Sequence, residues 1–413
     1  MKLEFKVTTL ITLFSYVGLL FFTGFISFLY HMATGGSGAD LANDTEGSPV
    51  NKIVGLSLLL VCFYYSVRYQ LIINKTYLYQ NFWLIFFVLY IFFSCLWSVD
   101  PGTSIRRAIF LLSVVFFAGY LTRLYTIETV FSCIGYLIAL YAILGLLRAV
   151  VDPSNTFLSG GLRDGAFLGI FSDKNGGART YVFGIMFLLP NVFKKNKLAL
   201  VATLFCLICL AISHSASGLI MLAIGGGTYL FFNQLVVSNY ILNIKKYFLG
   251  GIVYISACAL LYQSYQFILN LVGRDADLTD RSQIWAILTP LVEQKLMLGY
   301  GFGAFWGSSA GAEFIDRWKY IGNAHNGYIE TLLHGGLPLL VILLLSLIFA
   351  IKKSIINASA NYHAPYQNIS IAILIQLLVI NFVAYSIPNH NSTDFFVFML
   401  VLFYANQAPR REE

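Results

Sequence analysis

The residues best suited to chemistry gather in one polar stretch, from Leu271 to Asn326, of a chain that is otherwise strongly apolar. The stretch ends in Gly-Asn-Ala-His-Asn-Gly-Tyr-Ile-Glu (322–330) and leads directly back into an apolar run. Its ionisable residues include Arg274, Asp275, Asp277, Asp280, Arg281, Glu293, Glu313, Asp316, Arg317, Lys319 and His325. Charged groups kept together between apolar segments indicate that the chemistry takes place at one membrane face.

His325 stands where this stretch re-enters the membrane, at or just before the start of a helix. A neutral imidazole there can accept a proton from a hydroxyl, and a helix N-terminus disfavours the imidazolium form. The alternative is a loop histidine that caps the helix or bonds to the backbone. Because arginines lie nearby in the sequence, we favour the interpretation of His325 as a general base. His334 is predicted to lie on the opposite helix face, and Glu330 also points away from His325.

Several basic residues fall at or near the predicted external ends of apolar spans, where topology disfavours positive charge. Each could pair with a nearby acid, as Arg106 with Asp100 or Arg163 with Asp164. As a group they resemble a socket for a phosphate or pyrophosphate, because arginine is permanently charged and binds phosphate oxygens in a bidentate fashion. The set is Arg106, Arg107, Arg163, Lys174, Arg179, Arg274 and Arg281.

Patterns for metal or nucleotide binding are weak. Cys206 and Cys209 share a helix face, but no third or fourth ligand is in reach, so we interpret them as packing residues and predict no metal site. The glycine-rich segment 299–305 follows no strand and lacks the Lys-Ser/Thr pair of a phosphate-binding loop. It better fits closely packed backbone beside aromatic rings, or a platform for a sugar.

The composition requires that membrane helices position these residues. Hydrophobic residues make up 58% of the 413, charged residues 11%, and the mean hydropathy is +0.75, whereas soluble domains are about a quarter charged. We predict an all-α polytopic membrane protein with about 12 transmembrane helices. The spans are expected near 8–31, 53–68, 79–97, 106–122, 128–149, 176–193, 198–213, 218–236, 247–270, 327–350, 367–387 and 394–408.

The positive-inside rule sets the predicted orientation. With both termini in the cytoplasm, more than half of the Lys and Arg but few of the Asp and Glu face inside, and the long polar loop faces outside. The first apolar stretch is too long for a signal peptide and is read as a retained helix. The basic excess is therefore a topological signal, and no motif for nucleic-acid binding accompanies it.

The chain reads as a single transmembrane domain, 1–413, in which residues 271–326 form a large external loop that carries the active site. Apolar residues recur at helical spacing from Ser282 to Gln294, so a short helix is expected inside this loop.

Five stretches together resemble the O-antigen polymerase and ligase superfamily of bacterial membrane glycosyltransferases. They are Gly-Ile-Phe-Ser-Asp-Lys-Asn (169–175), Leu-Thr-Asp-Arg-Ser-Gln-Ile-Trp (278–285), Leu-Gly-Tyr-Gly-Phe-Gly-Ala-Phe (298–305), Ala-His-Asn-Gly-Tyr-Ile-Glu (324–330) and Gly-Gly-Leu-Pro (335–338). The His-Asn element followed about nine residues later by a glycine pair is the most specific.

The resemblance implies a GT-C-like fold in the bacterial inner membrane with a periplasmic active site. It also implies metal-independent, inverting transfer of a glycan from undecaprenyl pyrophosphate, with no cofactor. His325 matches the family histidine that deprotonates the acceptor hydroxyl. Arg281 matches the family arginine that neutralises the departing pyrophosphate, although Asp280 here replaces the family's preceding glycine. The partners it implies are lipid-linked substrates, membrane lipids and, among proteins, a chain-length regulator.

Within that family we favour a polymerase of surface polysaccharide, an O-antigen or exopolysaccharide, that adds lipid-linked repeat units. The segment 213–218 lacks the arginine of ligases, which disfavours the alternative of transfer to lipid A-core. Arg274, Arg163, Lys174 and Arg179 are predicted to bind pyrophosphate with Arg281. The residues expected to contact sugar are Asn326, Tyr300 and Trp306. A lipid-linked oligosaccharide flippase and a non-catalytic scaffold remain more distant alternatives.

Overall fold

The computed structural model of the protein describes residues 2–34, 49–159, 164–237, 281–318, 322–360 and 363–407. Over these ranges the regular structure is helical, with one isolated antiparallel bridge between Phe157 and Phe167. The prediction of an all-α membrane protein is confirmed. The predicted span at 247–270 and part of the long polar loop lie outside the described residues.

Helices occupy each of the other predicted spans. Most of their bounds agree with the apolar runs to within six residues, but the helix expected at 327–350 continues to Ser359 and the one expected at 367–387 ends at Ile380. The described residues form the following helices, some of them outside the predicted spans. They are α1 (Lys2–Phe22), α2 (Phe25–Thr34), α4 (Pro49–Arg68), α5 (Lys75–Gln80), α6 (Phe82–Phe93), η1 (Ser94–Trp97), α7 (Pro101–Leu124), α8 (Ile127–Val151), η2 (Pro153–Asn155), α9 (Lys174–Phe193), α10 (Lys197–Ile212), α11 (Ala216–Val237), α13 (Arg281–Gln294), η4 (Phe305–Gly307), α14 (Ser309–Trp318), α15 (Gly327–Ser359), α16 (Ala364–Ile380) and α17 (Thr393–Asn406).

Five of the described helices are long and apolar enough to cross a membrane: α4, α7, α8, α11 and α15. The pair α1 and α2 would make a sixth span. The segments 82–97, 197–212, 364–380 and 393–406 are apolar but shorter, and a full crossing takes about 20 residues. The chain is a polytopic membrane protein, and the number of about 12 spans stays a prediction.

Two of the apolar runs are broken by glycine. The first, read from sequence as one span at 8–31, bends by 70° between α1 and α2. Gly24 has φ +88° there, and the hydroxyl of Thr23 bonds both to Leu19 O and to the Tyr141 hydroxyl. In α15, Gly336 has φ 67° and ψ −166°, which interrupts the helix just before Pro338. Residues other than glycine rarely adopt either backbone conformation.

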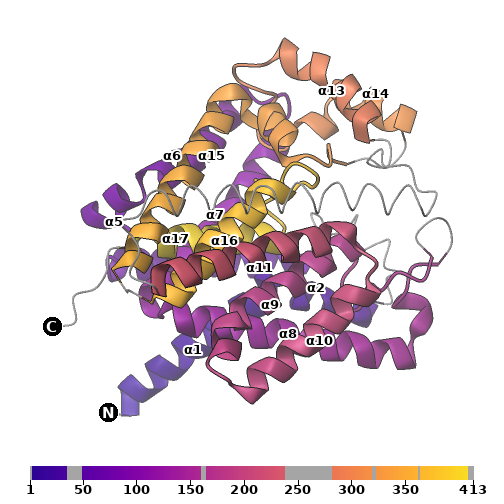
Figure 1. The fold of residues 1–413 in the computed structure, drawn as a ribbon. Helices are drawn as coiled ribbons and strands as arrows, with labels where there is room; N and C mark the ends of the chain where they lie inside the picture. The colour runs from indigo at the N-terminus through magenta and orange to yellow at the C-terminus, as the bar shows by residue number, and fades with distance from the viewer. Residues whose placement is uncertain are drawn as a thin grey trace. The chain divides into compact units, whose positions relative to one another are not determined.

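The chain forms two compact units. The first contains Met1–Asn81, Ile109–Leu222 and Asn389–Gln407. In it α8, α9 and α10 pack against one another (Figure 1), and α9 is buried along most of its length. Residues expected on the same membrane side meet: Lys194 with Glu128 at 3.0 Å, and Lys174 Nζ with the carbonyl of His214 at 3.3 Å. These contacts agree with the predicted topology of this unit without showing which end faces outward.

The second unit contains Phe82–Ala108, Ala223–Pro388 and Ala408–Glu413. Here α15 packs on α6 and α16, and α13 packs on α15 (Figure 1). The helix expected over 282–294 is confirmed as α13, whose Ile284 and Leu288 are buried in a local core. That core also contains Val292, Tyr300, Phe305, Trp306, Phe314, Ala324 and Leu333. The single transmembrane domain and the external position of residues 271–326 stay predictions.

Candidate active site

His325 occupies a sharp turn immediately before α15. Its φ is 49°, in the left-handed region that non-glycine residues seldom enter. Its backbone N–H donates to Asn323 Oδ1 at 2.9 Å, and the imidazole-bearing residue is partly exposed. Strained backbone of this kind concentrates at functional sites, where the surrounding structure must hold it in place.

The turn is held on its C-terminal side by the cap of α15. Asn326 accepts hydrogen bonds from the backbone N–H groups of Tyr328 and Ile329 at 2.9 and 3.2 Å. Gly327 donates its N–H to the carbonyls of Asn381 and Ala384 at 2.7 and 3.0 Å. A side chain at Gly327 would overlap Asn381, so the close approach of these two segments requires glycine.

The turn is held on its N-terminal side by a buried carboxylate. Glu330 is 0% exposed, and its Oε1 accepts hydrogen bonds from the N–H of Ala324 and from Trp306 Nε1 at 3.0 Å. Its Oε2 lies 3.8 Å from His334 Nε2, which also contacts the Tyr385 hydroxyl at 2.9 Å. Glu330 thus fixes the residue that precedes His325 through a hydrogen bond to its backbone N–H.

Helix α13 brings Arg281 to the same place. Arg281 and Trp285 are one turn apart and therefore share a helix face. Trp285 Nε1 donates to the carbonyl of Ala324 at 2.9 Å, next to His325, and the Arg281 guanidinium donates to the carbonyl of Val383. Val383 lies in the short segment 381–384 that also accepts the N–H of Gly327. Arg281 and the turn that contains His325 are therefore both attached to residues 381–384, the turn through Gly327.

The glycine-rich segment 299–305 is closely packed backbone, as expected, and it supports Trp306. Tyr300 bonds to the backbone of Leu333 and of Val99, at 2.7 and 2.9 Å. Gly303 has φ 68°; its carbonyl accepts from Arg107 Nη1 at 2.7 Å, and its N–H points to His334 Nδ1 at 3.3 Å. The packing leaves no room for side chains at these glycines. Its role as a sugar platform stays a prediction.

The three residues predicted to contact sugar are largely buried. Asn326, Tyr300 and Trp306 are 3%, 5% and 8% exposed. Asn326 caps α15, Trp306 bonds to Glu330, and the Tyr300 hydroxyl donates to the carbonyl of Leu291 at 2.8 Å. Burial raises the pKa of Tyr300, which keeps it a neutral donor. The structure gives all three a supporting role, and their contact with glycan stays a prediction.

The predicted pyrophosphate residues are distributed across the chain. Arg281 lies in the second unit, whereas Lys174 and Arg179 lie in the first, at the start of α9. Arg179 is 9% exposed, and its Nε lies 2.7 Å from Asp394 Oδ2. Arg163 and Arg274 lie outside the described residues. Pyrophosphate binding by these residues stays a prediction.

Sequence reasoning did not assign Glu330 a role at the histidine turn, nor did it single out Asp394. A signal was available for both, because an ionisable residue inside an apolar helix needs a partner. The partners themselves, Ala324 N–H and Arg179, could not be read from spacing. In the described ranges no group of three or more His, Cys, Asp and Glu could hold a metal ion; independence of metal stays a prediction.

The geometry suits acid–base chemistry beside an anion. A partly exposed imidazole stands in a rigid turn, and a permanently charged guanidinium lies on the neighbouring helix face. Such a pair can deprotonate a hydroxyl while a preorganised cation stabilises a leaving phosphate. The rigidity of the turn matters because catalysis depends on holding the base in one position.

The chain is similar in sequence to known proteins. Residues 201–344 match the family described as O-antigen ligase, a range that contains both Arg281 and His325. The exopolysaccharide production protein ExoQ of Rhizobium meliloti (strain 1021) is 27% identical over 287 residues. The match covers 65% of this chain and 64% of that relative, so the chain spans somewhat less than two thirds of its length. The resemblance seen in sequence is confirmed as far as these matches reach: residues 201–344 of this polytopic membrane protein match the O-antigen ligase family, and the chain is similar to an exopolysaccharide production protein.

Proposed function

We propose that the protein is a glycosyltransferase of the bacterial inner membrane that polymerises a surface polysaccharide. It transfers a growing glycan from undecaprenyl pyrophosphate to a free hydroxyl on an incoming lipid-linked repeat unit. The family match over 201–344 and the similarity to an exopolysaccharide production protein support this substrate class.

The observation that supports the proposal most is that Arg281 and Gly327, which is two residues after His325, both bond to the segment 381–384. Trp285, on the same helix face as Arg281, bonds to the carbonyl of Ala324. His325 takes the proton from the acceptor hydroxyl as that oxygen attacks the anomeric carbon. The bond from this carbon to the pyrophosphate oxygen breaks, and the electron pair leaves with the pyrophosphate. Arg281 stabilises the added negative charge. Attack from the face opposite the leaving group inverts the configuration at the anomeric carbon.

The proposed site faces the periplasm, where lipid-linked glycans are presented after crossing the membrane. The distribution of basic residues in short loops supports this orientation. No step in the scheme needs a metal ion, because a fixed guanidinium can supply the charge that a metal would otherwise provide.

Transfer to lipid A-core is the second candidate, since the matched family is described as O-antigen ligase. The two functions share a donor and differ in the acceptor. The purified protein, reconstituted with a lipid-linked repeat unit as its only substrate and with EDTA present, should yield a ladder of longer lipid-linked glycans.

Products that appear only after lipid A-core is added would replace the polymerase with the ligase. If neither acceptor is used and intact lipid-linked glycan crosses the bilayer of proteoliposomes instead, the protein is a flippase and the proposal is wrong. If transfer occurs only when a divalent metal is supplied, the protein is still a glycosyltransferase but the metal-free scheme is wrong.

A further inference from the structure

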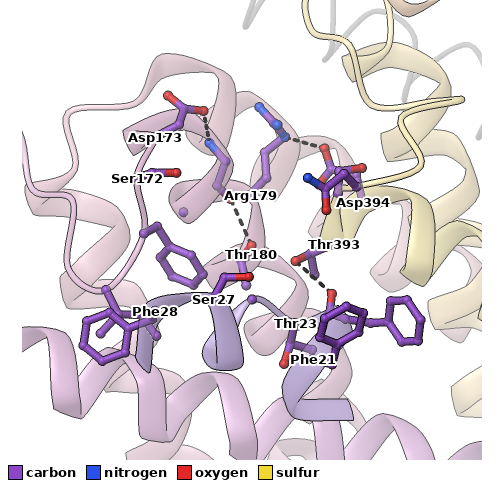
Figure 2. Close-up of a pocket in the computed structure, with 18 of the residues that line it drawn as sticks. Phe21, Thr23, Ser27, Phe28, Ser172, Asp173, Arg179, Thr180, Thr393 and Asp394 are labelled. Carbon is purple, nitrogen blue, oxygen red and sulfur yellow. Dashed lines mark hydrogen bonds and ion pairs between the residues drawn. The ribbon is translucent and has the colours of Figure 1, made fainter. Parts of the chain in front are cut away.

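The first unit contains a cavity that the proposed chemistry does not use. It has a volume of about 200 Å³ and opens where the break between α1 and α2 meets the starts of α9 and α17 (Figure 2). The break between the two helices borders the cavity: Gly24 lines it, and a Cβ at this position would meet no atom within 4 Å. All residues that line the cavity belong to this unit.

A buried ion pair forms one wall of the cavity. Arg179, from the first turns of α9, points to Asp394 of α17, and the two side chains meet at 2.7 Å (Figure 2). Asp394 is 2% exposed and Arg179 9%. Removing both charges from water costs free energy that their attraction often does not repay. A contribution to stability is therefore a weak explanation for this buried ion pair.

The cavity is poorly suited to an anion. The guanidinium of Arg179 is already bound to Asp394, and the start of α9, which could otherwise attract an anion, is occupied by the carboxylate of Asp173. Asp173 accepts hydrogen bonds from the N–H groups of Asn175 and Gly176 at 3.2 and 2.7 Å. The lining thus holds two carboxylates and one guanidinium, with His390 as a further titratable residue, so a phosphate would meet at least as much negative as positive charge.

The same lining is well suited to a ring with several hydroxyl groups. Carboxylates, hydroxyls and amides line the space together with aromatic rings. In Figure 2 the rings of Phe21 and Phe28 lie below the polar side chains of Asp173 and Arg179. Acceptors such as Asp173 bind hydroxyl protons, donors such as Asn391 bind hydroxyl oxygens, and aromatic faces pack against the C–H groups of a sugar. The polar members include Ser27, Asn51, Ser172, Thr180, Asn391 and Thr393, and the aromatic ones Phe28, Phe110 and Phe171.

We propose that this cavity binds one uncharged sugar ring. Its volume of about 200 Å³ is below the roughly 300–1,000 Å³ of pockets for drug-sized ligands, so it suits a single ring better than a longer glycan. Arg179 and Asp394 position each other's polar atoms against the ring. Only one part of this proposal rests on the proposed function, namely that the sugar ring belongs to a lipid-linked glycan. The binding of a sugar in the cavity is argued from the lining alone.

The test measures binding apart from transfer. The full-length protein is placed in lipid nanodiscs, which avoids detergents with sugar headgroups. Methyl glycosides of glucose, galactose and mannose are then screened by saturation-transfer NMR, with inorganic pyrophosphate as competitor. Ser27→Phe fills the cavity from α2, and Ser172→Leu blocks its partly exposed rim. Thr34→Phe, on the same helix outside the lining, is the matched control.

Wild type and Thr34→Phe should bind at least one glycoside, and pyrophosphate should not displace it. Both cavity variants should bind at least about tenfold more weakly while unfolding at the wild-type temperature. Displacement by pyrophosphate would show an anion site and overturn the proposal. So would a lack of binding to wild type, or binding that neither cavity variant weakens. A protein that binds sugar but transfers no glycan would refute the proposed function alone.

Discussion

At the scale of single residues, the site depends on how one histidine is held. His325 lies between Ala324, which is bonded to Glu330 and Trp285, and Asn326, which caps α15. The sequence singled out His325 as the one histidine of the polar stretch 271–326, and the family resemblance singled out Arg281 among its three arginines. It could not identify the support from Glu330, since that support is a contact to backbone six residues away.

Replacing Glu330 with glutamine should impair catalysis more than binding. The amide keeps the size of the side chain but weakens the bond to the Ala324 N–H, so the turn loses part of its rigidity. We expect kcat to fall by about 10- to 100-fold with little change in KM for the lipid-linked donor. Glu293→Gln, at an exposed position of α13, should be neutral. Equal kcat in the two variants would show that Glu330 does not position the histidine.

Replacing Trp306 with phenylalanine should lower stability. The change removes the Nε1–H that bonds to buried Glu330 and leaves a carboxylate oxygen with one donor fewer. The expected loss is about 1–3 kcal/mol of unfolding free energy, measured by denaturant titration. Trp97→Phe, which removes an exposed bond to Leu298, should cost clearly less. Equal losses would contradict the role assigned to the Trp306–Glu330 bond.

At the scale of elements, the positions of the helices follow from the apolar runs, and their interruptions do not. Hydropathy located α4 and α8 because a helix needs about 20 apolar residues to cross the membrane. In lipid the backbone must also form its hydrogen bonds within the helix. It could not show the 70° bend at Gly24, since a glycine inside an apolar run is compatible with a straight helix. The bend matters because residues on both sides of it line the cavity of the first unit.

The break at Gly336 offers a direct stability test. With φ 67° and ψ −166°, this residue lies in a region open almost only to glycine, so Gly336→Ala should destabilise by about 1–3 kcal/mol. Gly226→Ala, in α11 with open space around the new methyl group, should be neutral or stabilise by up to ~1 kcal/mol. Thermal unfolding of both variants gives the comparison. A neutral Gly336→Ala would mean that α15 runs straight in the membrane.

At the scale of the whole molecule, composition was enough to predict a polytopic membrane protein, and the structure and comparisons confirm it. The number of spans could not be settled by hydropathy, because helices such as α10 and α16 are apolar but shorter than a full crossing. The division into two units also escaped prediction. It depends on contacts between segments far apart in sequence, such as those of α17 with α9.

The predicted orientation can be tested by labelling introduced cysteines with a membrane-impermeant maleimide in a cysteine-free background. Ser154→Cys, beyond the end of α8, should react in intact spheroplasts, because this end is expected in the periplasm. Lys197→Cys, at the start of α10, should react only after permeabilisation. The reverse pattern would place the termini outside and the candidate active site in the cytoplasm.

The most direct test of the central claim is transfer by the reconstituted protein with a lipid-linked repeat unit, comparing wild type with His325→Ala, Arg281→Ala and the double variant. The account predicts a product ladder from wild type, a loss of at least about 100-fold in each single variant, and little further loss in the double variant, because the two residues act in one step. All variants should unfold at similar temperatures, and His325→Ala should still bind the donor. Single variants that keep near-wild-type transfer would contradict the account and move the active site away from the turn before α15.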